Sequence, residues 1–129
     1  MEINTTENLI LLSLIKTWWK SDDKAGKPYQ DVISELLNGN SYLYIENMNP
    51  NYNEIKLSFN IYQKEGKNYL TAFTDLDLLS KWIGIESKYV KLETKDLMKM
   101  TEQIDIDGII INTHSENSFG VFINKNFKS

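Results

Sequence analysis

The sequence predicts a mixed α/β (α+β) fold, in which one mixed sheet of about five to six strands has helices packed on it. Strand-like alternation and helix-like periodicity follow one another along the chain. Apolar residues make up 41% of the chain and aromatic residues 12%, which is enough for a hydrophobic core. A length of 129 residues suits one domain, which we expect to cover residues 1–129.

The clearest signal is a strand that leads directly into a helix. Residues 69–73 alternate with the period of two that is typical of a strand. Thr74 then stands where a helix N-cap belongs and Asp77 follows at the third helical position, which predicts an acidic capping box. Apolar residues continue at helical spacing to Trp82, and Gly84 is expected to end the helix.

A first helix is expected at the start of the chain. Asn4 and Glu7 resemble a capping box that opens a helix of about Thr5 to Lys20. Its apolar residues cover more than one stripe, so either the helix is deeply buried or one side meets a partner. Trp18 and Trp19 are adjacent and point about 100° apart on a helix. Either both are buried, or one is exposed as an interface anchor.

Two further helices and six strands account for most of the chain. Pro28 favours the first turn of a helix of about Tyr29 to Leu37, which Gly39 ends. Thr94 is expected to cap a further helix with Asp96 in its first turn. The strands are expected at Tyr42–Glu46, Ile55–Ile61, Tyr69–Phe73, Tyr89–Leu92, Gly108–Asn112 and Phe119–Ile123, with a hairpin turn through Gln63–Lys67.

Charge and composition exclude several classes of function. The 14 basic residues are all lysine, and the net charge is −4 with a pI near 5.0. Nucleic-acid binding needs a positive field, so we expect no nucleic acid and favour a basic or neutral partner over an anionic one. The apolar run Leu9–Ile15 is shorter than the roughly 20 residues that span a bilayer, and no positive segment precedes it. We therefore expect a cytoplasmic protein without a membrane segment.

No residue pattern predicts catalysis or a cofactor. The chain lacks cysteine and has a single histidine, His114, so a zinc site is not expected. Asp105 and Asp107 resemble the middle of a calcium loop, but the flanking acidic positions are not filled. Helix capping explains Asp75 and Asp77, although a hydrolase that uses carboxylates alone stays an open alternative. We predict a non-enzymatic protein with no cofactor and no metal.

Six short motifs spread over most of the chain carry a resemblance to a known family. They are Pro28-Tyr29, Leu43–Ile45, Phe73-Thr74-Asp75, Trp82, Tyr89-Val90 and Ile109–Asn112. In this order they resemble the N-terminal domain of the SseB family, named for enhanced serine sensitivity. Thr113 and His114 stand where the family tends to have Pro-Gly, so we expect a different turn there. Sulfur transfer has been associated with the family name, but a chain without cysteine cannot carry a persulfide by that route.

The resemblance also implies a function. Stand-alone domains of this type occur near bacterial secreted-toxin genes and look like immunity proteins. We therefore predict a protein-binding domain of the immunity type, which neutralises a secreted toxin with a basic surface by direct binding. The residues expected to contact the partner are Asp75, Asp77, Asp105, Asp107, Trp18 and Trp19.

Two alternatives concern other binding modes. One is a small-molecule sensor or regulatory domain, with the ligand beside the sheet near Phe73, Trp82 and Asn112. The other is a homodimer, in which an edge strand such as Tyr42–Glu46 pairs with its copy.

Overall fold

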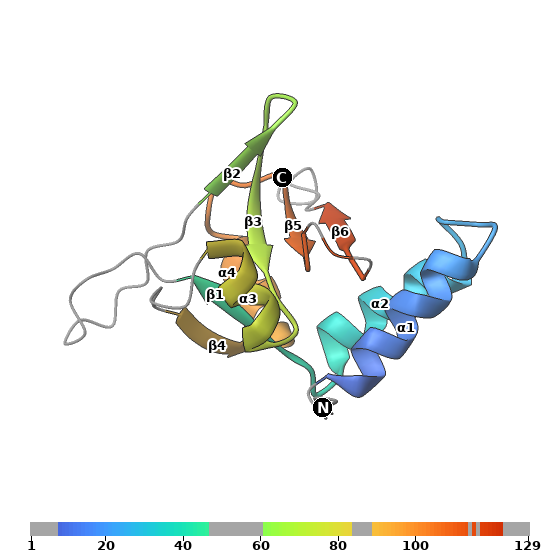
Figure 1. Ribbon diagram of the computed structural model, residues 1–129. Coiled ribbons are helices and arrows are strands. Elements are labelled where there is room, and N and C mark those ends of the chain that lie inside the picture. Colours follow the sequence, from blue (N-terminus) through green and yellow to red (C-terminus); the bar gives the residue numbers. More distant parts are fainter. Residues whose placement is uncertain (1–7, 47–60, 84–88, 114, 116, 123–129) are drawn as a thin grey trace.

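The computed structural model describes residues 8–46, 61–83, 89–113, 115 and 117–122, apart from the side chains of Trp82 and Ile83. The helices in this part are α1 (Leu9–Lys20), α2 (Lys27–Asn38), α3 (Leu76–Ile83) and α4 (Thr94–Thr101). The strands are β1 (Tyr42–Glu46), β2 (Ile61–Lys64), β3 (Lys67–Ala72), β4 (Tyr89–Glu93), β5 (Gly108–Ile111) and β6 (Phe119–Phe122). Figure 1 shows α1 and α2 side by side next to β6.

The described strands form a mixed four-stranded sheet and a two-stranded sheet. The larger sheet has the order β2-β3-β5-β6, with β3 and β5 parallel and the two outer strands antiparallel to them. The smaller sheet pairs β1 with β4. The α+β class and the mixed sheet are as predicted, whereas the strands are divided between two sheets. The connection from β3 to β5 contains α3, β4 and α4, and it places β4 against β1.

One isolated bridge joins the two sheets. The Tyr44 N–H donates to the Phe73 carbonyl oxygen at 2.8 Å, and the Phe73 N–H donates to the Tyr44 carbonyl oxygen at 2.9 Å. β1 therefore has β4 on one side and this bridge on the other. The Tyr44 backbone, in the strand expected to offer an edge to a second copy, is thus bonded within the chain, and a homodimer through the rest of this edge stays a prediction.

The β2–β3 hairpin closes with a two-residue turn. Glu65 and Gly66 both have positive φ, 53° and 78°, as the tight turns of hairpins require. The turn is shorter than the predicted Gln63–Lys67 because these end residues belong to the strands. The Asn-rich segment 47–53 and most of the expected strand at 55–61 lie outside the described residues.

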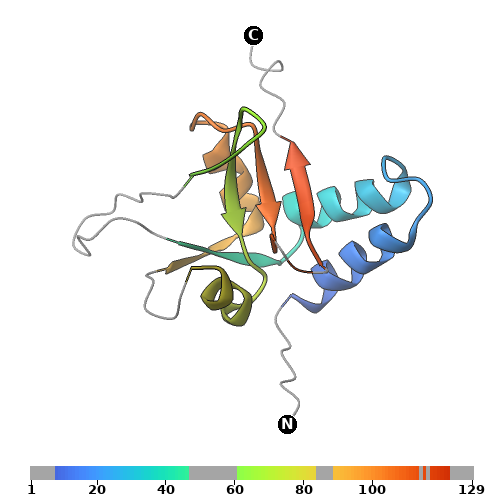
Figure 2. The same ribbon diagram turned by 45° about the horizontal axis from the view of Figure 1, so that its top comes forward.

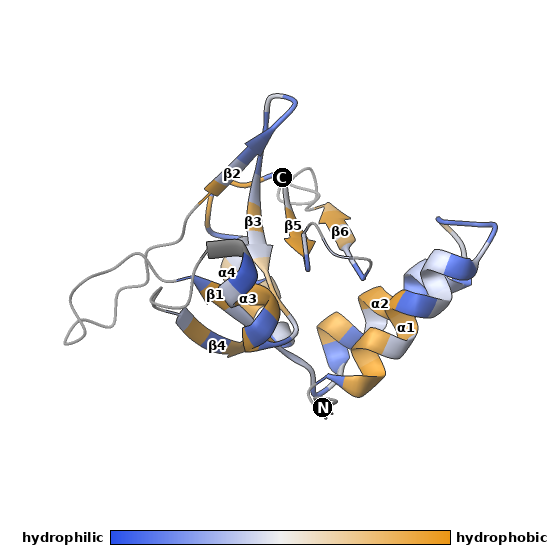
Figure 3. Ribbon diagram, viewed as in Figure 1, coloured by the Kyte–Doolittle hydropathy of each residue, from blue (hydrophilic) through white to orange (hydrophobic). Residues whose placement is uncertain are grey.

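The four-stranded sheet has one buried face and one open face. Leu97 of α4 and Val32 and Leu36 of α2 share one core cluster with the buried face. Figure 2 shows α4 behind β3 and β5, and Figure 3 shows apolar residues along β5 and β6 and over much of α1. The buried face carries Leu70, Ala72, Ile109, Ile111, Phe119 and Val121. The opposite side carries Lys64, Tyr69, Ile110, Gly120 and Phe122, and is called the open face below.

The helix starts differ from the predicted caps. α1 begins at Leu9 rather than near Thr5, because Asn8 has a left-handed backbone with φ 54° that an α-helix cannot contain. The expected Asn4–Glu7 capping box lies outside the described residues. Thr94 is the first residue of α4 rather than its cap, and its buried hydroxyl donates to the Ser41 carbonyl oxygen at 3.3 Å. Pro28 in the first turn of α2 and Gly39 at its end are as predicted.

Candidate functional site

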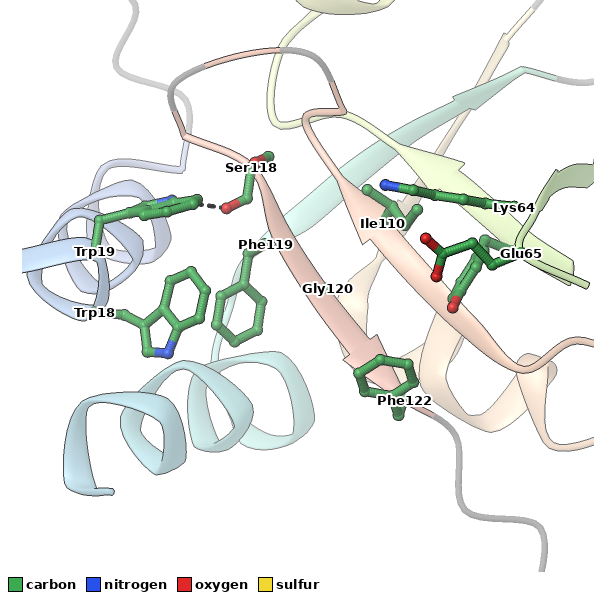
Figure 4. A pocket seen from close by; sticks show the side chains of 10 residues that line it. Trp18, Trp19, Lys64, Glu65, Ile110, Ser118, Phe119, Gly120 and Phe122 are labelled. Carbon is green, nitrogen blue, oxygen red and sulfur yellow. Dashed lines mark hydrogen bonds between the residues drawn. The ribbon is translucent and has the colours of Figure 1, made fainter. Parts of the chain in front are cut away.

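Trp18 and Trp19 occupy different environments at the end of α1. Trp18 is half-buried, and its ring meets Phe119 edge-on with 4.8 Å between centroids. The Trp19 side chain is 46% exposed, and its indole N–H donates to the Ser118 carbonyl oxygen at 2.8 Å (Figure 4). Because adjacent helical residues point about 100° apart, only one of them faces the core. Of the two arrangements open from the sequence, the structure has the one with an exposed tryptophan.

Lys24 holds this tryptophan pair in place. Its ammonium group donates to the carbonyl oxygens of Trp18 at 2.9 Å, Trp19 at 2.7 Å and Ser21 at 2.7 Å. These carbonyls lie at the negative end of the α1 dipole, where a cation is favourable. The same ammonium lies 5.2 Å from the Trp18 ring centroid and 5.8 Å from that of Trp19, within the range of a cation–π contact.

A trough runs across the open face beside Trp19. Its volume is ≈ 350 Å³. Trp18 and Trp19 line it from α1, Lys64 and Glu65 line it from the β2–β3 hairpin, and the open face forms its floor. Figure 4 shows the tryptophans on one side of β6, and Ile110, Lys64 and Glu65 on the other. Phe122 is 64% exposed at the end of this floor.

A second hollow of ≈ 340 Å³ adjoins the trough. Lys16, Trp19, Lys20 and Asn117 line it, so the Trp19 ring lies between the two hollows. Lys16 and Lys20 are four residues apart on α1 and therefore lie on the same side of the helix. The surface around Trp19 is consequently aromatic in its centre and carries lysines along the α1 side.

The four candidate aspartates do not form one site. Asp75 accepts a hydrogen bond from the Leu78 N–H at 2.9 Å, and Asp107 accepts one from the Asn68 N–H at 2.8 Å. Asp77 and Asp105 are exposed. β3 and β5 run parallel, with Tyr69 opposite Gly108 and Ala72 opposite Ile111. Asp107 comes just before the start of β5, whereas Asp75 comes after the end of β3, at the opposite end of this strand pair. Two of the four therefore bind backbone groups, and the pairs lie at opposite ends of the sheet.

The predicted cap of α3 is wrong. Thr74 is buried, and its N–H donates to Asn112 Oδ1 at 2.9 Å rather than joining a capping box. The first free N–H groups of the helix are instead capped by Asp75, through its bond to Leu78. The N-cap is therefore Asp75 rather than Thr74, because Thr74 is bonded to Asn112, which is 38 positions away in sequence.

Two of the three residues expected near the ligand of a sensor are buried. Phe73 and Asn112 are 1% and 0% exposed, so neither presents a surface to a small molecule. The Trp82 side chain and His114 lie outside the described residues. Among the residues described, no three or more His, Asp or Glu side chains gather where a metal ion would bind. None of the described helices has the length and apolar character to cross a bilayer.

The sequence did not indicate Phe122, Ser118, Lys16, Lys20 or Lys64 as site residues. Phe122 has a readable signal, because it alternates with the core residues Phe119 and Val121 in β6 and falls on the opposite face. The lysines have no such signal, since they line the two hollows beside Trp19 only when α1 and the β2–β3 hairpin are placed around the sheet.

Comparison with known proteins gives a family match. A model described as the SseB protein N-terminal domain matches residues 18–122, a stretch that contains both sheets and begins at the tryptophan pair. Comparison with curated proteins and with solved structures found no match. The family match covers most of the chain and agrees with the motif resemblance, and the chain therefore belongs to the SseB protein N-terminal domain family.

Proposed function

We propose that this chain is a non-enzymatic protein-binding domain that holds its partner on the open face of the four-stranded sheet. The observation that carries the proposal is the exposed but fixed ring of Trp19. It is 46% exposed, lies 4.9 Å from the Trp18 ring centroid, and is bonded through its indole N–H to Ser118. A large aromatic side chain held in one orientation loses little entropy on binding and is a typical interface anchor.

The surroundings of Trp19 support binding rather than catalysis. Tyr69, Ile110 and Phe122 continue the apolar surface across three strands. A contiguous apolar patch of this kind marks an interaction site more often than an isolated exposed side chain does. The described ionisable groups around the trough are lysines, the phenol of Tyr69 and one carboxylate, Glu65. Acid–base catalysis needs a base held beside a reacting group.

For the class of partner, we propose a secreted bacterial toxin that this domain neutralises as an immunity protein. Support comes from the membership of the SseB N-terminal domain family. The resemblance to that family implies, in addition, the role that stand-alone domains of this type have near bacterial secreted-toxin genes. An immunity protein acts by covering or distorting its toxin. A rigid aromatic face that offers a broad contact surface suits such a role.

The test is affinity capture with the tagged protein from its native cell, followed by mass spectrometry of the eluate. The wild type is compared with Trp19→Ala and with Tyr89→Ala. Tyr89 is 48% exposed on β4, in the other sheet, and is therefore a matched control. We expect one stoichiometric partner with the wild type and with Tyr89→Ala, and its loss with Trp19→Ala.

Two results contradict the proposal. Absence of any stoichiometric partner contradicts a protein-binding function, and a partner retained equally by Trp19→Ala contradicts this face. A thermal melt of each variant checks that the fold is kept. Because nearly half of Trp19 is exposed, its replacement is expected to change the free energy of unfolding less than Trp18→Ala does. Trp18→Ala removes the half-buried ring that packs against Phe119 and costs at most about 3–5 kcal/mol.

A further inference from the structure

The charge around the trough is opposite in sign to that of the whole chain. Lys16, Lys20 and Lys64 line the two hollows that meet at Trp19, against one described carboxylate, Glu65. These groups together carry a charge of +2, whereas the chain carries −4. Lys67, whose ammonium lies 5.7 Å from the Phe122 ring centroid, extends the positive charge to the far end of the floor.

These lysines are not neutralised by described carboxylates. In the described ranges the ion pair within 4 Å is Lys27 with Asp31, on α2, and it involves none of the trough lysines. Lys16, Lys20 and Lys64 are all exposed. Ion pairing with a carboxylate would reduce the positive potential of these lysines. Because they are exposed and form no such pair in the described ranges, this potential is available to a partner.

The floor of the trough has room for apolar side chains. Gly120 lies at its centre, and a Cβ atom placed there would meet no atom within 4 Å. Tyr69 and Ile110 lie on one side of this position and Phe122 further along the same strand. A segment seated on the floor contacts aromatic and aliphatic side chains, and its outward-facing groups lie beside the lysines.

We propose that the trough binds an acidic segment of a partner protein, with apolar side chains over Tyr69, Ile110 and Phe122 and carboxylates beside Lys16, Lys20 and Lys64. This inference rests on the proposed protein-binding function and specifies the chemistry of the contact. Charge complementarity selects the occupant, because three exposed lysines that form no ion pair with the described carboxylates favour an acidic segment and disfavour a basic one. The net charge of the chain alone suggests a basic partner, whereas the charge around this face favours an acidic one.

A protein segment suits the trough better than a nucleic acid. The chain has no arginine, which is the side chain that recognises phosphate through two parallel hydrogen bonds. The net charge of −4 repels an extended polyanion beyond the trough. A short acidic segment avoids that repulsion because it does not extend beyond the two hollows that Lys16, Lys20 and Lys64 line.

The experiment is selection from a random library of short displayed peptides, with the intact protein as bait. Four baits are compared. They are the wild type, Trp19→Ala, the triple variant Lys16→Glu/Lys20→Glu/Lys64→Glu, and the control triple variant Lys81→Glu/Lys95→Glu/Lys99→Glu. The control makes the same change of charge on α3 and α4, away from the trough.

We expect the wild type and the control triple variant to enrich peptides that combine Asp or Glu with aromatic or aliphatic residues. Binding of a selected peptide, measured by fluorescence anisotropy, is expected to fall about tenfold or more with the trough triple variant and to weaken as salt rises. Single-stranded oligonucleotides serve as a second probe and are expected not to bind.

The remaining outcomes overturn the inference in distinguishable ways. Neutral or basic peptides that depend on Trp19 would refute the acidic segment but keep the proposed protein-binding face. No peptide that depends on Trp19 would count against both. Oligonucleotides that bind the wild type and not the trough triple variant would assign the trough to nucleic acid. Self-association in sedimentation velocity that this variant abolishes would assign it to a second copy.

Discussion

Two asparagines hold the peptide groups of Thr74 from both sides. Asn112 Oδ1 accepts from the Thr74 N–H at 2.9 Å, and Asn8 Nδ2 donates to the Thr74 carbonyl oxygen at 2.8 Å. Both asparagines are buried and have left-handed backbones, with φ of 55° and 54°, a conformation that Asn adopts more readily than most residues. The start of α1, the end of β3 and the end of β5 therefore meet at one residue.

Asn112→Ala is expected to lower the free energy of unfolding by about 2–4 kcal/mol, because it leaves the buried Thr74 N–H unpaired and puts alanine in a left-handed conformation. Urea denaturation measures the change. The control is Asn38→Ala, an exposed position at the end of α2, which should stay within about 0.5 kcal/mol of the wild type. An equal effect of the two substitutions would show that the Thr74 contacts do not stabilise the fold.

At the scale of elements, the start of α3 depends on the side chain of Asp75. Its carboxylate accepts from the Leu78 N–H at 2.9 Å, whereas the Thr74 hydroxyl accepts from Asn112 Nδ2 at 3.0 Å. Asp77 lies exposed in the first turn, where it interacts favourably with the helix dipole only. The two aspartates therefore contribute through different contacts.

Asp75→Ala is expected to cost about 1 kcal/mol of unfolding free energy, the usual effect of losing a helix N-cap. Asp77→Ala removes the same charge from the same turn and is expected to cost less than half as much. Thermal denaturation of the two variants, side by side with the wild type, compares them directly. A larger loss of unfolding free energy with Asp77→Ala than with Asp75→Ala would contradict Asp75 as the N-cap and favour the Thr74–Asp77 capping box.

Two glycines of the four-stranded sheet differ sharply in the space around them. A Cβ atom on Gly108 would lie 2.5 Å from the Val121 carbonyl oxygen, a backbone atom of the neighbouring strand. At Gly120 a Cβ atom would meet nothing within 4 Å. β5 and β6 therefore tolerate a side chain at one of these positions only.

Gly108→Ala is expected to lower the free energy of unfolding by about 1–3 kcal/mol, because the methyl group forces β5 and β6 apart. Gly120→Ala is expected to leave stability unchanged or raise it by up to about 1 kcal/mol, since alanine reduces the entropy of the unfolded chain. Chemical denaturation measures both. Similar losses at the two positions would contradict the close approach at Gly108.

At the scale of the whole molecule, one core cluster connects both sheets. Leu43 and Ile45 of β1 share this cluster with Leu70 of β3 and Ile109 of β5, and α1, α2 and α4 also contribute to it. The two sheets are further linked by the Tyr44–Phe73 bridge. Neither sheet keeps a complete core without the other.

We therefore expect the two sheets to unfold in a single transition. Hydrogen exchange followed by NMR measures this, with amides of β1 and of β5 compared at increasing denaturant. Their opening free energies are expected to converge on the global value. Exchange of the β1–β4 amides through a separate opening of lower free energy would show that the smaller sheet folds as its own unit.

Local patterns predicted most of the elements. Alternation in Tyr42–Glu46 matches β1, and Pro28 and Gly39 mark the ends of α2 to within two residues. The hairpin turn at Gly66 was also predicted, because its positive φ favours glycine. Each of these features depends on neighbours in sequence, and a sequence pattern therefore contains the information that determines it.

The candidate site was predicted in part. The tryptophan pair was recognised as the possible anchor, because adjacent helical positions cannot both face one narrow core. Which of the two is exposed depends on Phe119, about 100 residues away, which packs against Trp18. Lys16 and Lys20 come from α1 and Lys64 comes from the β2–β3 hairpin. No spacing in sequence relates the α1 lysines to Lys64.

The sequence by itself therefore determined the α+β class, the order of the elements and the aromatic character of the site. Tertiary structure decided the division into two sheets, the identity of the α3 cap and the positive charge beside Trp19. The physical reason is the range of the interactions. Propensity, turn geometry and periodicity act between neighbours in sequence. Contacts such as Asn112 with Thr74 and β1 with β4, and the hollow that Trp19 and Lys64 line together, form only when the whole chain packs around its core.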